Sequence, residues 1–164
     1  MATSSAVVSA AINTHATDTI NDFNSKLRLS KLSAAIDAAD VSILNSENTI
    51  LLQKKFTPTL NASGNHTLDF VNEIYREIPD SSSLFADGSA PVSSTTFVFA
   101  GLTGCSLRDN GEGKLQVVQQ ESSVLNIVSN DIGTVDYTNG MVTISKFLVS
   151  SFTGDAICVS INPV

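Results

Sequence analysis

The sequence contains few of the residue types on which most binding and catalytic chemistry depends. Its 164 residues include no tryptophan, two tyrosines, two histidines and two cysteines. So few tyrosines, with no tryptophan, make an aromatic platform for stacking on sugars improbable. Cys105 and Cys158 cannot form a disulfide framework, and their apolar neighbours are typical of buried free thiols. A single disulfide between the two remains an alternative.

Basic residues are also scarce, with nine against sixteen acidic residues and a net charge of −7. Because nucleic-acid-binding proteins usually carry a basic footprint, we expect no nucleic-acid partner. Charged residues make up only 15% of the chain, which favours permanent contact with other proteins because few charges must be desolvated. Most of the basic residues precede Phe56, and the second half is acidic. This asymmetry indicates either two solvated faces or head-to-tail attraction between copies or partners.

Long apolar segments are absent from the sequence. No run approaches the roughly 20 residues that a membrane-spanning helix needs, and residues 1–12 lack the basic start and continuous apolar core of a signal peptide. We therefore expect no membrane span and a protein made in the cytoplasm. The hydrophobic share of 42% is enough to offset the entropy of folding, so disorder is not expected.

The chain carries no familiar catalytic or cofactor-binding motif. There is no phosphate-binding glycine loop, no dinucleotide fingerprint and no nucleophile elbow. His15 and His66 have no cysteine or histidine at metal-ligand spacing, so we interpret both as solvated or partly satisfied side chains. We predict no catalytic residue, no cofactor and no metal ligand, and a protein that is not an enzyme.

Two acidic groupings nevertheless offer alternatives to this interpretation. The loop "DNGEG" at 109–113 holds three oxygen ligands, but a hairpin turn with positive φ at Asn110 and Gly111 explains it better than a calcium site. Asp69, Glu73 and Glu77 recur at intervals of four, and a solvated face is favoured there over a pair for acid–base work.

Residues 4–28 show the apolar periodicity of a helix, with a break expected between Ser25 and Ser30 and one continuous helix as the alternative. Its opposite face is Ser, Thr, Asn and Asp, which makes the helix weak unless the stripe docks onto something. A shorter helix is expected after Ser30 as N-cap, with Leu32 and Ile36 facing inward. Asp40 should then turn the chain into "VSIL". The stripe of the first helix comprises Val8, Ile12, Ala16, Ile20, Phe23 and Leu27.

From Ile50 onward the pattern is that of strands. Residues 50–58 and 66–74 predict a hairpin whose loop contains Gly64, with Leu68 and Phe70 facing a core. After a connector bounded by proline, turn signals separate further short strands, which indicates an antiparallel sheet, a small sandwich or an open barrel. These further strands are predicted at 95–100, 105–109, 114–120, 123–129, 133–138, 141–147 and 155–161.

The predicted class is therefore α+β. It comprises a helical pair plus β-hairpin (1–79), a connector (80–91) and an antiparallel β subdomain (92–164). Within the subdomain, Asn139-Gly140 predicts a two-residue hairpin turn between flanking alternating strands. Asp136 is interpreted as a turn-stabilising or interface acid.

Several segments resemble a known family. The stretch "FNSKLRLSKLSAAIDAADVSIL" at 23–44, followed by "KKFTPTL" and "HTLDFVNEI", resembles the C-terminal region of the baseplate wedge proteins of T4-like tailed phages. It is more remotely similar to the J-type baseplate family. The resemblance covers most of residues 20–150, and family members are much longer. The residues that carry it are Leu29, Leu32, Ile36, Asp40, Ser42 and Ile43, and in the later hairpin Gly133, Asp136, Tyr137 and Gly140.

The resemblance implies a structural component of a virion, located in the tail baseplate and made in the host cytoplasm. Its partners would be itself, through dimer or ring contacts, and other baseplate wedge proteins. From the residues, we predict an interface along the helical stripe and the basic positions beside it. The alternative is a β-rich module that binds a carbohydrate or cell-surface ligand, and a hydrolase with a carboxylate pair ranks below it. The predicted interface residues are Val8, Ile12, Ile20, Phe23, Leu27, Lys26, Arg28 and Lys31.

Overall fold

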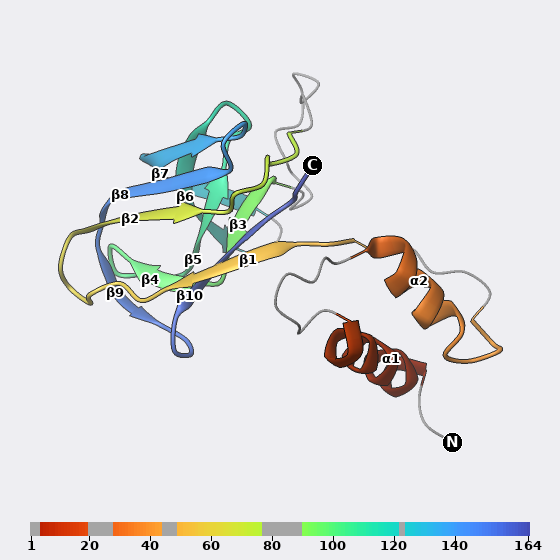
Figure 1. Ribbon diagram of the computed structural model, residues 1–164. Coiled ribbons are helices and arrows are strands. Elements are labelled where there is room, and N and C mark those ends of the chain that lie inside the picture. The colour runs from red at the N-terminus through yellow and green to blue at the C-terminus, as the bar shows by residue number, and fades with distance from the viewer. Residues whose placement is uncertain (1–3, 20–27, 44–48, 77–89, 122–123) are drawn as a thin grey trace. The chain divides into compact units, whose positions relative to one another are not determined.

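The protein consists of two compact units, residues 1–49 and 50–164. A computed structural model describes residues 4–19, 28–43, 49–76, 90–121 and 124–164 (Figure 1). The part of the first unit that the structure describes contains two helices, and a mainly antiparallel sheet forms the second unit. The predicted α+β class is therefore confirmed.

The helical unit contains α1 (Ser4–Thr19) and α2 (Leu29–Asp37). The predicted continuation of the first helix to residue 28 falls on residues 20–27, which lie outside the described residues. The predicted N-cap of the second helix is wrong by two positions. Arg28, with an extended backbone, is the N-cap, because its carbonyl already accepts the N–H groups of Lys31 and Leu32 at 3.0 and 3.1 Å.

The expected turn at Asp40 is confirmed. One oxygen of Asp40 accepts the backbone N–H of Ser42 at 2.9 Å and the Ser42 hydroxyl at 2.7 Å. These hydrogen bonds hold the pKa of Asp40 below its usual value. The turn follows α2 directly, so the aspartate redirects the chain after the helix ends.

Within the described residues, ten strands form one sheet. The path of paired neighbours runs β1-β10-β3-β5-β6-β7-β8-β2, and β4 pairs with β5 and β9. Figure 1 shows β7, β8 and β2 side by side. The strands are β1 (Leu52–Phe56), β2 (Gly64–Asp69), β3 (Val92–Ser94), β4 (Phe97–Phe99), β5 (Leu102–Asp109), β6 (Lys114–Glu121), β7 (Val124–Asp136), β8 (Met141–Phe147), β9 (Val149–Phe152) and β10 (Ile157–Ile161).

The predicted hairpin between residues 50–58 and 66–74 is wrong. β1 pairs with β10, with Phe56 opposite Ile157, and β2 pairs with β8, with Leu68 opposite Val142. Both strands thus join the sheet formed by the C-terminal strands and lie at opposite ends of its path. Local alternation shows which face a strand buries but carries no information about its partner strand.

Two other parts of the strand prediction differ from the structure. The expected strands 123–129 and 133–138 form the single strand β7, whose register against β6 shifts around Val117. The short strands β3 and β9 were not expected. Of the predicted connector 80–91, residues 80–89 lie outside the described residues, and Ala90 and Pro91 are buried.

The hairpin at 134–147 is confirmed, but its turn is longer than predicted. β7 and β8 pair up to Asp136 opposite Met141, which leaves a four-residue loop. Gly140 adopts φ +66°. Asn139 does not adopt positive φ. It donates its backbone N–H and its side-chain amide to the Asp136 carboxylate at 3.0 and 2.8 Å. The predicted turn-stabilising role of Asp136 is therefore confirmed.

The core of the sheet unit surrounds Phe147, which is fully buried. The Phe97 ring meets it edge-on with centroids 5.0 Å apart, and Phe56 lies 5.9 Å away at a tilt of 52°. Leu68 and Phe70 are buried as predicted. The core therefore joins side chains from both ends of the unit's sequence.

We expect Gly140→Ala to destabilise the protein more than Gly154→Ala. Both glycines have positive φ, which costs an alanine about 1–2 kcal/mol. A Cβ at Gly140 would also collide with the Asn72 backbone carbonyl, whereas a Cβ at Gly154 meets nothing within 4 Å. Urea unfolding should show a larger loss for Gly140→Ala, and equal losses would show that the 72–140 contact can relax freely.

Candidate interaction surfaces and a buried turn network

The described residues of the helical unit bury few side chains. Among its described residues, Ile36 is the one buried side chain. Val8 and Leu32 are half-buried, while Ile12 is 39% exposed and Leu29 is 41% exposed. Helices of this length gain most of their stability from packing an apolar face. The exposed side chains of Ile12 and Leu29 are therefore apolar surface that a partner could cover.

The structure describes four of the eight predicted interface residues. Val8 and Ile12 lie on α1, and Arg28 and Lys31 are exposed at the start of α2. A surface hollow of about 330 Å³ within this unit is lined from both helices, with His15 and Asp18 on its rim. The other predicted interface residues, Ile20, Phe23, Lys26 and Leu27, lie outside the described residues.

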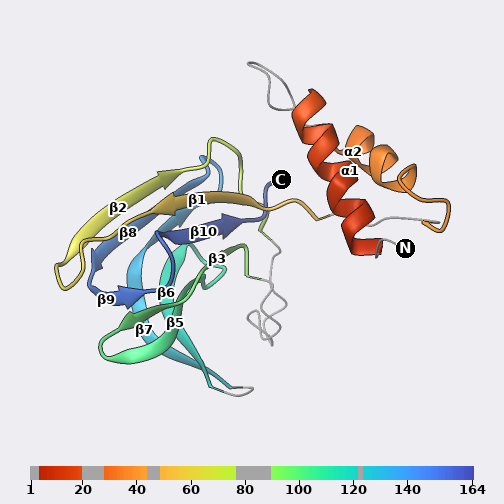
Figure 2. The ribbon, with the colours of Figure 1, turned by 90° about the horizontal axis from the view of Figure 1, so that it is seen from below.

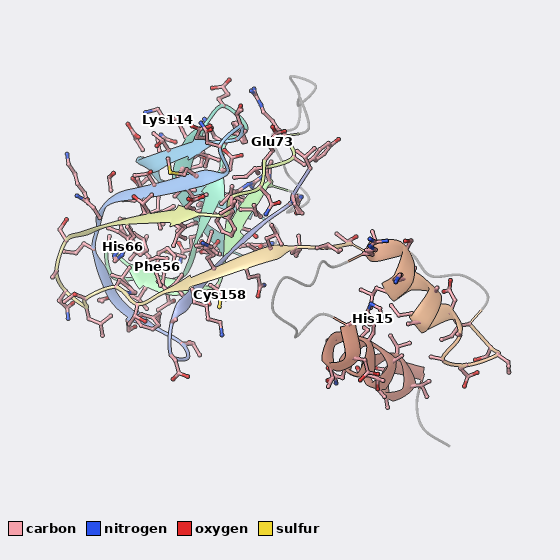
Figure 3. The ribbon with its side chains drawn as sticks, in the orientation of Figure 1. His15, Phe56, His66, Glu73, Lys114 and Cys158 are labelled. Carbon is pink, nitrogen blue, oxygen red and sulfur yellow. The ribbon has the colours of Figure 1, made fainter. Side chains whose placement is uncertain are left out.

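His66 sits in an apolar setting on β2. Its ring lies beside Phe56, with centroids 4.6 Å apart and planes tilted by 42° (Figure 3). Its Nε2 atom is buried without a hydrogen-bond partner. Burial lowers the pKa of His66, so the neutral form is favoured. In the described part of the chain, no three His, Cys, Asp or Glu side chains gather where they could hold a metal ion.

The two cysteines are both free thiols, and the alternative of a disulfide between them does not hold. Cys105 is buried and Cys158 is partly exposed. Burial raises the pKa of the Cys105 thiol. A protonated thiol is a poor nucleophile, so Cys105 serves as a small core residue.

The loop at 109–113 is a hairpin turn organised by a buried carboxylate. β5 and β6 pair up to Asp109 opposite Leu115. One oxygen of Asp109 accepts the N–H of Gly111 at 3.0 Å, and Asn110 accepts the N–H groups of Glu112 and Lys114. The predicted turn is confirmed, but positive φ falls on Gly111 and Gly113 instead of Asn110.

Tyr137 joins this turn to the β7–β8 turn. Its hydroxyl donates to the Asp109 carboxylate, with oxygen–oxygen distances of 2.9 and 2.8 Å, and accepts the N–H of Gly113 at 2.9 Å. The Arg76 guanidinium lies 5.3 Å from the centre of the Tyr137 ring. Sequence reasoning weighed Asp109 as a calcium ligand and missed its tyrosine partner, because the two residues lie 28 positions apart.

The electrostatics of this network are those of a buried structural acid. Burial raises the pKa of Asp109, and hydrogen bonds from Tyr137 and Gly111 oppose the rise. Burial and the neighbouring carboxylate raise the pKa of Tyr137. Because donors from two turns meet the carboxylate oxygens, the arrangement is suited to linking the turns and not to holding a cation.

We expect Tyr137→Phe to lower the free energy of unfolding by about 1–3 kcal/mol, because it leaves buried Asp109 and the Gly113 N–H without their partner. Urea unfolding measures the loss. Tyr75→Phe is the matched control, since Tyr75 is 51% exposed. Equal stability of the two variants would show that the hydroxyl contributes nothing to the link.

A third feature, which sequence reasoning missed, is the first part of β7. Val124 is 60% exposed, Leu125 37% and Ile127 54%. Leu125 and Ile127 also line a groove of about 150 Å³ together with Arg108 and Gln116 of the neighbouring strands. The sequence "SVLNIVS" could have indicated this feature, because its apolar residues do not alternate with polar ones. That pattern is typical of a strand with apolar residues on both faces.

Comparison with known proteins bears on the N-terminal part of the chain. Residues 4–55 match the model of the family described as baseplate structural protein gp6, C-terminal domain III. The match spans α1, α2 and most of β1, and it includes the six residues of the helical part that carry the resemblance to baseplate proteins. It supports a phage baseplate protein. Among curated proteins, none matches the chain significantly.

The family description bears on one further expectation, and the described helices bear on another. A structural baseplate family favours a non-enzymatic role. No described helix is long and apolar enough to cross a membrane.

Proposed function

We propose that this protein is a structural subunit of a contractile phage tail baseplate, where it forms contacts between subunits of the wedge ring. The observation that carries the proposal is the match of residues 4–55 to a domain of a baseplate structural protein. The same match does not favour a module that binds carbohydrate or a cell-surface ligand.

The helical unit supplies the physical support for an assembly role. Two helices with Ile36 as their buried side chain, among the described residues, leave apolar surface that a neighbouring subunit could cover. The low charged fraction of 15% points the same way, because association then desolvates few ions. We propose the stripe that includes Val8 and Ile12, the basic residues around Arg28 and Lys31, or both, as a subunit contact. Its partners would be further copies of the chain and other wedge proteins.

The location is tested by immunogold labelling of purified virions with antibodies raised against this chain. We expect gold at the distal end of the tail, where the baseplate lies. Antibody absorbed beforehand with the purified chain is the control. Gold on the heads would contradict the proposal. Unlabelled virions would also contradict it, provided that the infected-cell extract contains the protein.

The helical contact is tested by Ile12→Asp. Ile12 is 39% exposed, so the substitution should spare the helix, but a carboxylate buried at a contact is costly. We expect self-association to weaken at least about tenfold, equivalent to about 1.4 kcal/mol, in sedimentation velocity over a concentration series. Asn13→Asp adds the same charge at an exposed neighbouring position and should have little effect. Equal association of the two variants would remove Ile12 from the contact.

A further inference from the structure

Among the described residues, the first part of β7, residues 124–131, pairs with a strand on one side only; we call this segment the free edge of β7. It pairs with β6, with Leu125 opposite Gln120 and Ile127 opposite Val118. The register with β8 begins only at Gly133. No described residue makes a backbone hydrogen bond to the other side of the segment. Unpaired N–H and C=O groups in a row are a template for another strand.

The free edge of β7 differs from the two edges at the ends of the sheet path. β1 exposes Lys54 and Lys55, and β2 exposes Asp69, and such charges oppose the addition of a further strand. The free edge of β7 exposes Val124, Leu125 and Ile127 and has no charged residue before Asp131. Asp131 itself is ion-paired with Lys114 at 3.1 Å. The edge therefore lacks the usual protection against strand addition.

We propose that the free edge of β7 pairs antiparallel with the same edge of a second copy of this chain, to give a sheet continuous across a dimer. The proposal rests on the assembly function above and names a surface and partner for one of its contacts. The last part of β6 and the first part of β7 extend beyond the neighbouring strands in Figure 2, and Val124, Leu125 and Ile127 are exposed there.

Charge argues for a second copy at this place. Each chain carries a net charge of −7, so two copies repel over most of their surfaces. Between residues 124 and 130 no ionisable side chain is present, so two copies can meet there without placing like charges opposite each other. The occupant must also be extended, because only a strand can satisfy a row of backbone groups.

The alternation of side chains limits the register of the pair. A two-fold axis perpendicular to the sheet keeps each side chain on its own face, so the axis must lie midway between the two copies of one residue. We choose Asn126 because this register pairs the exposed apolar side chains of Leu125 and Ile127. With the axis at Asn126, Leu125 lies opposite Ile127 of the second copy, and the reverse contact is identical. The shift of register against β6 that begins beyond Ile127 limits the pairing to the end of the hairpin.

A cysteine substitution tests the axis directly. In the pair, the two Asn126 positions face each other at the roughly 5 Å Cα separation of opposed strand residues, which a disulfide can span. In a Cys158→Ser background, we expect Asn126→Cys to form disulfide-linked dimers with oxidised glutathione much faster than Thr138→Cys, at an exposed residue of the β7–β8 turn. Equal rates for the two cysteines would overturn the proposal.

A charge pair tests the register. Leu125→Lys places a lysine against the second copy's Ile127 and should weaken dimerisation at least tenfold in sedimentation velocity. Adding Ile127→Glu converts both contacts into lysine–glutamate pairs and should restore most of the affinity. Leu60→Lys, at a residue 46% exposed in a loop, is the control and should dimerise like the parent. A Leu125→Lys variant that dimerises like the parent, or a parent that is monomeric at high concentration, would overturn the proposal.

The baseplate location and the β7 contact can be rejected independently of each other. Gold at the tail end together with no Asn126 cross-link would reject the β7 contact and leave the baseplate role intact. A rapid cross-link together with unlabelled virions would retain the pairing of two copies and reject the baseplate location.

Discussion

The sheet unit depends on long-range strand pairing between its two ends. β1 and β2 obtain their partners from β10 and β8, about 70 to 110 residues further along the chain. These pairings bring Phe56 and Leu68 onto the same core as Phe147 and Ile157. Because the core contains side chains from both ends, neither end can bury its apolar face alone, and the unit should fold as one cooperative body.

Two turns of this unit are tied together by one buried acid. Asp109 receives the N–H of its own turn and the hydroxyl of Tyr137 from the next hairpin. An acid that is buried this deeply is costly unless it is hydrogen-bonded. The network therefore sets the spacing of the β5–β6 and β7–β8 turns, and its chemistry is structural. Among the described residues, α1 with Ile12 and the free edge of β7 both expose apolar side chains, and we propose both as contact surfaces.

The sequence predicted local features well. Helical periodicity located α1 and α2, and alternation marked the β8 strand and the burial of Leu68 and Phe70. Turn chemistry identified the turn residues Asp40 and Asp136. It could not identify the partners of β1 and β2, because proximity in sequence favoured a hairpin that the core does not use. It also missed the free edge of β7, since exposure there depends on where β8 begins to pair. Part of the predicted helical interface, including Phe23, falls outside the described residues and stays a prediction.

By itself the sequence determined the α+β class, the division between helical and strand-forming segments, and the turns closed by aspartate and glycine. These features arise from contacts within a few residues, where side-chain period, capping and positive φ act directly. Only the tertiary structure decided that β1 joins β10, that Tyr137 reaches Asp109, and that Val124 to Ile127 remain uncovered. Each of these depends on which distant strands share a core, and local periodicity does not contain that information.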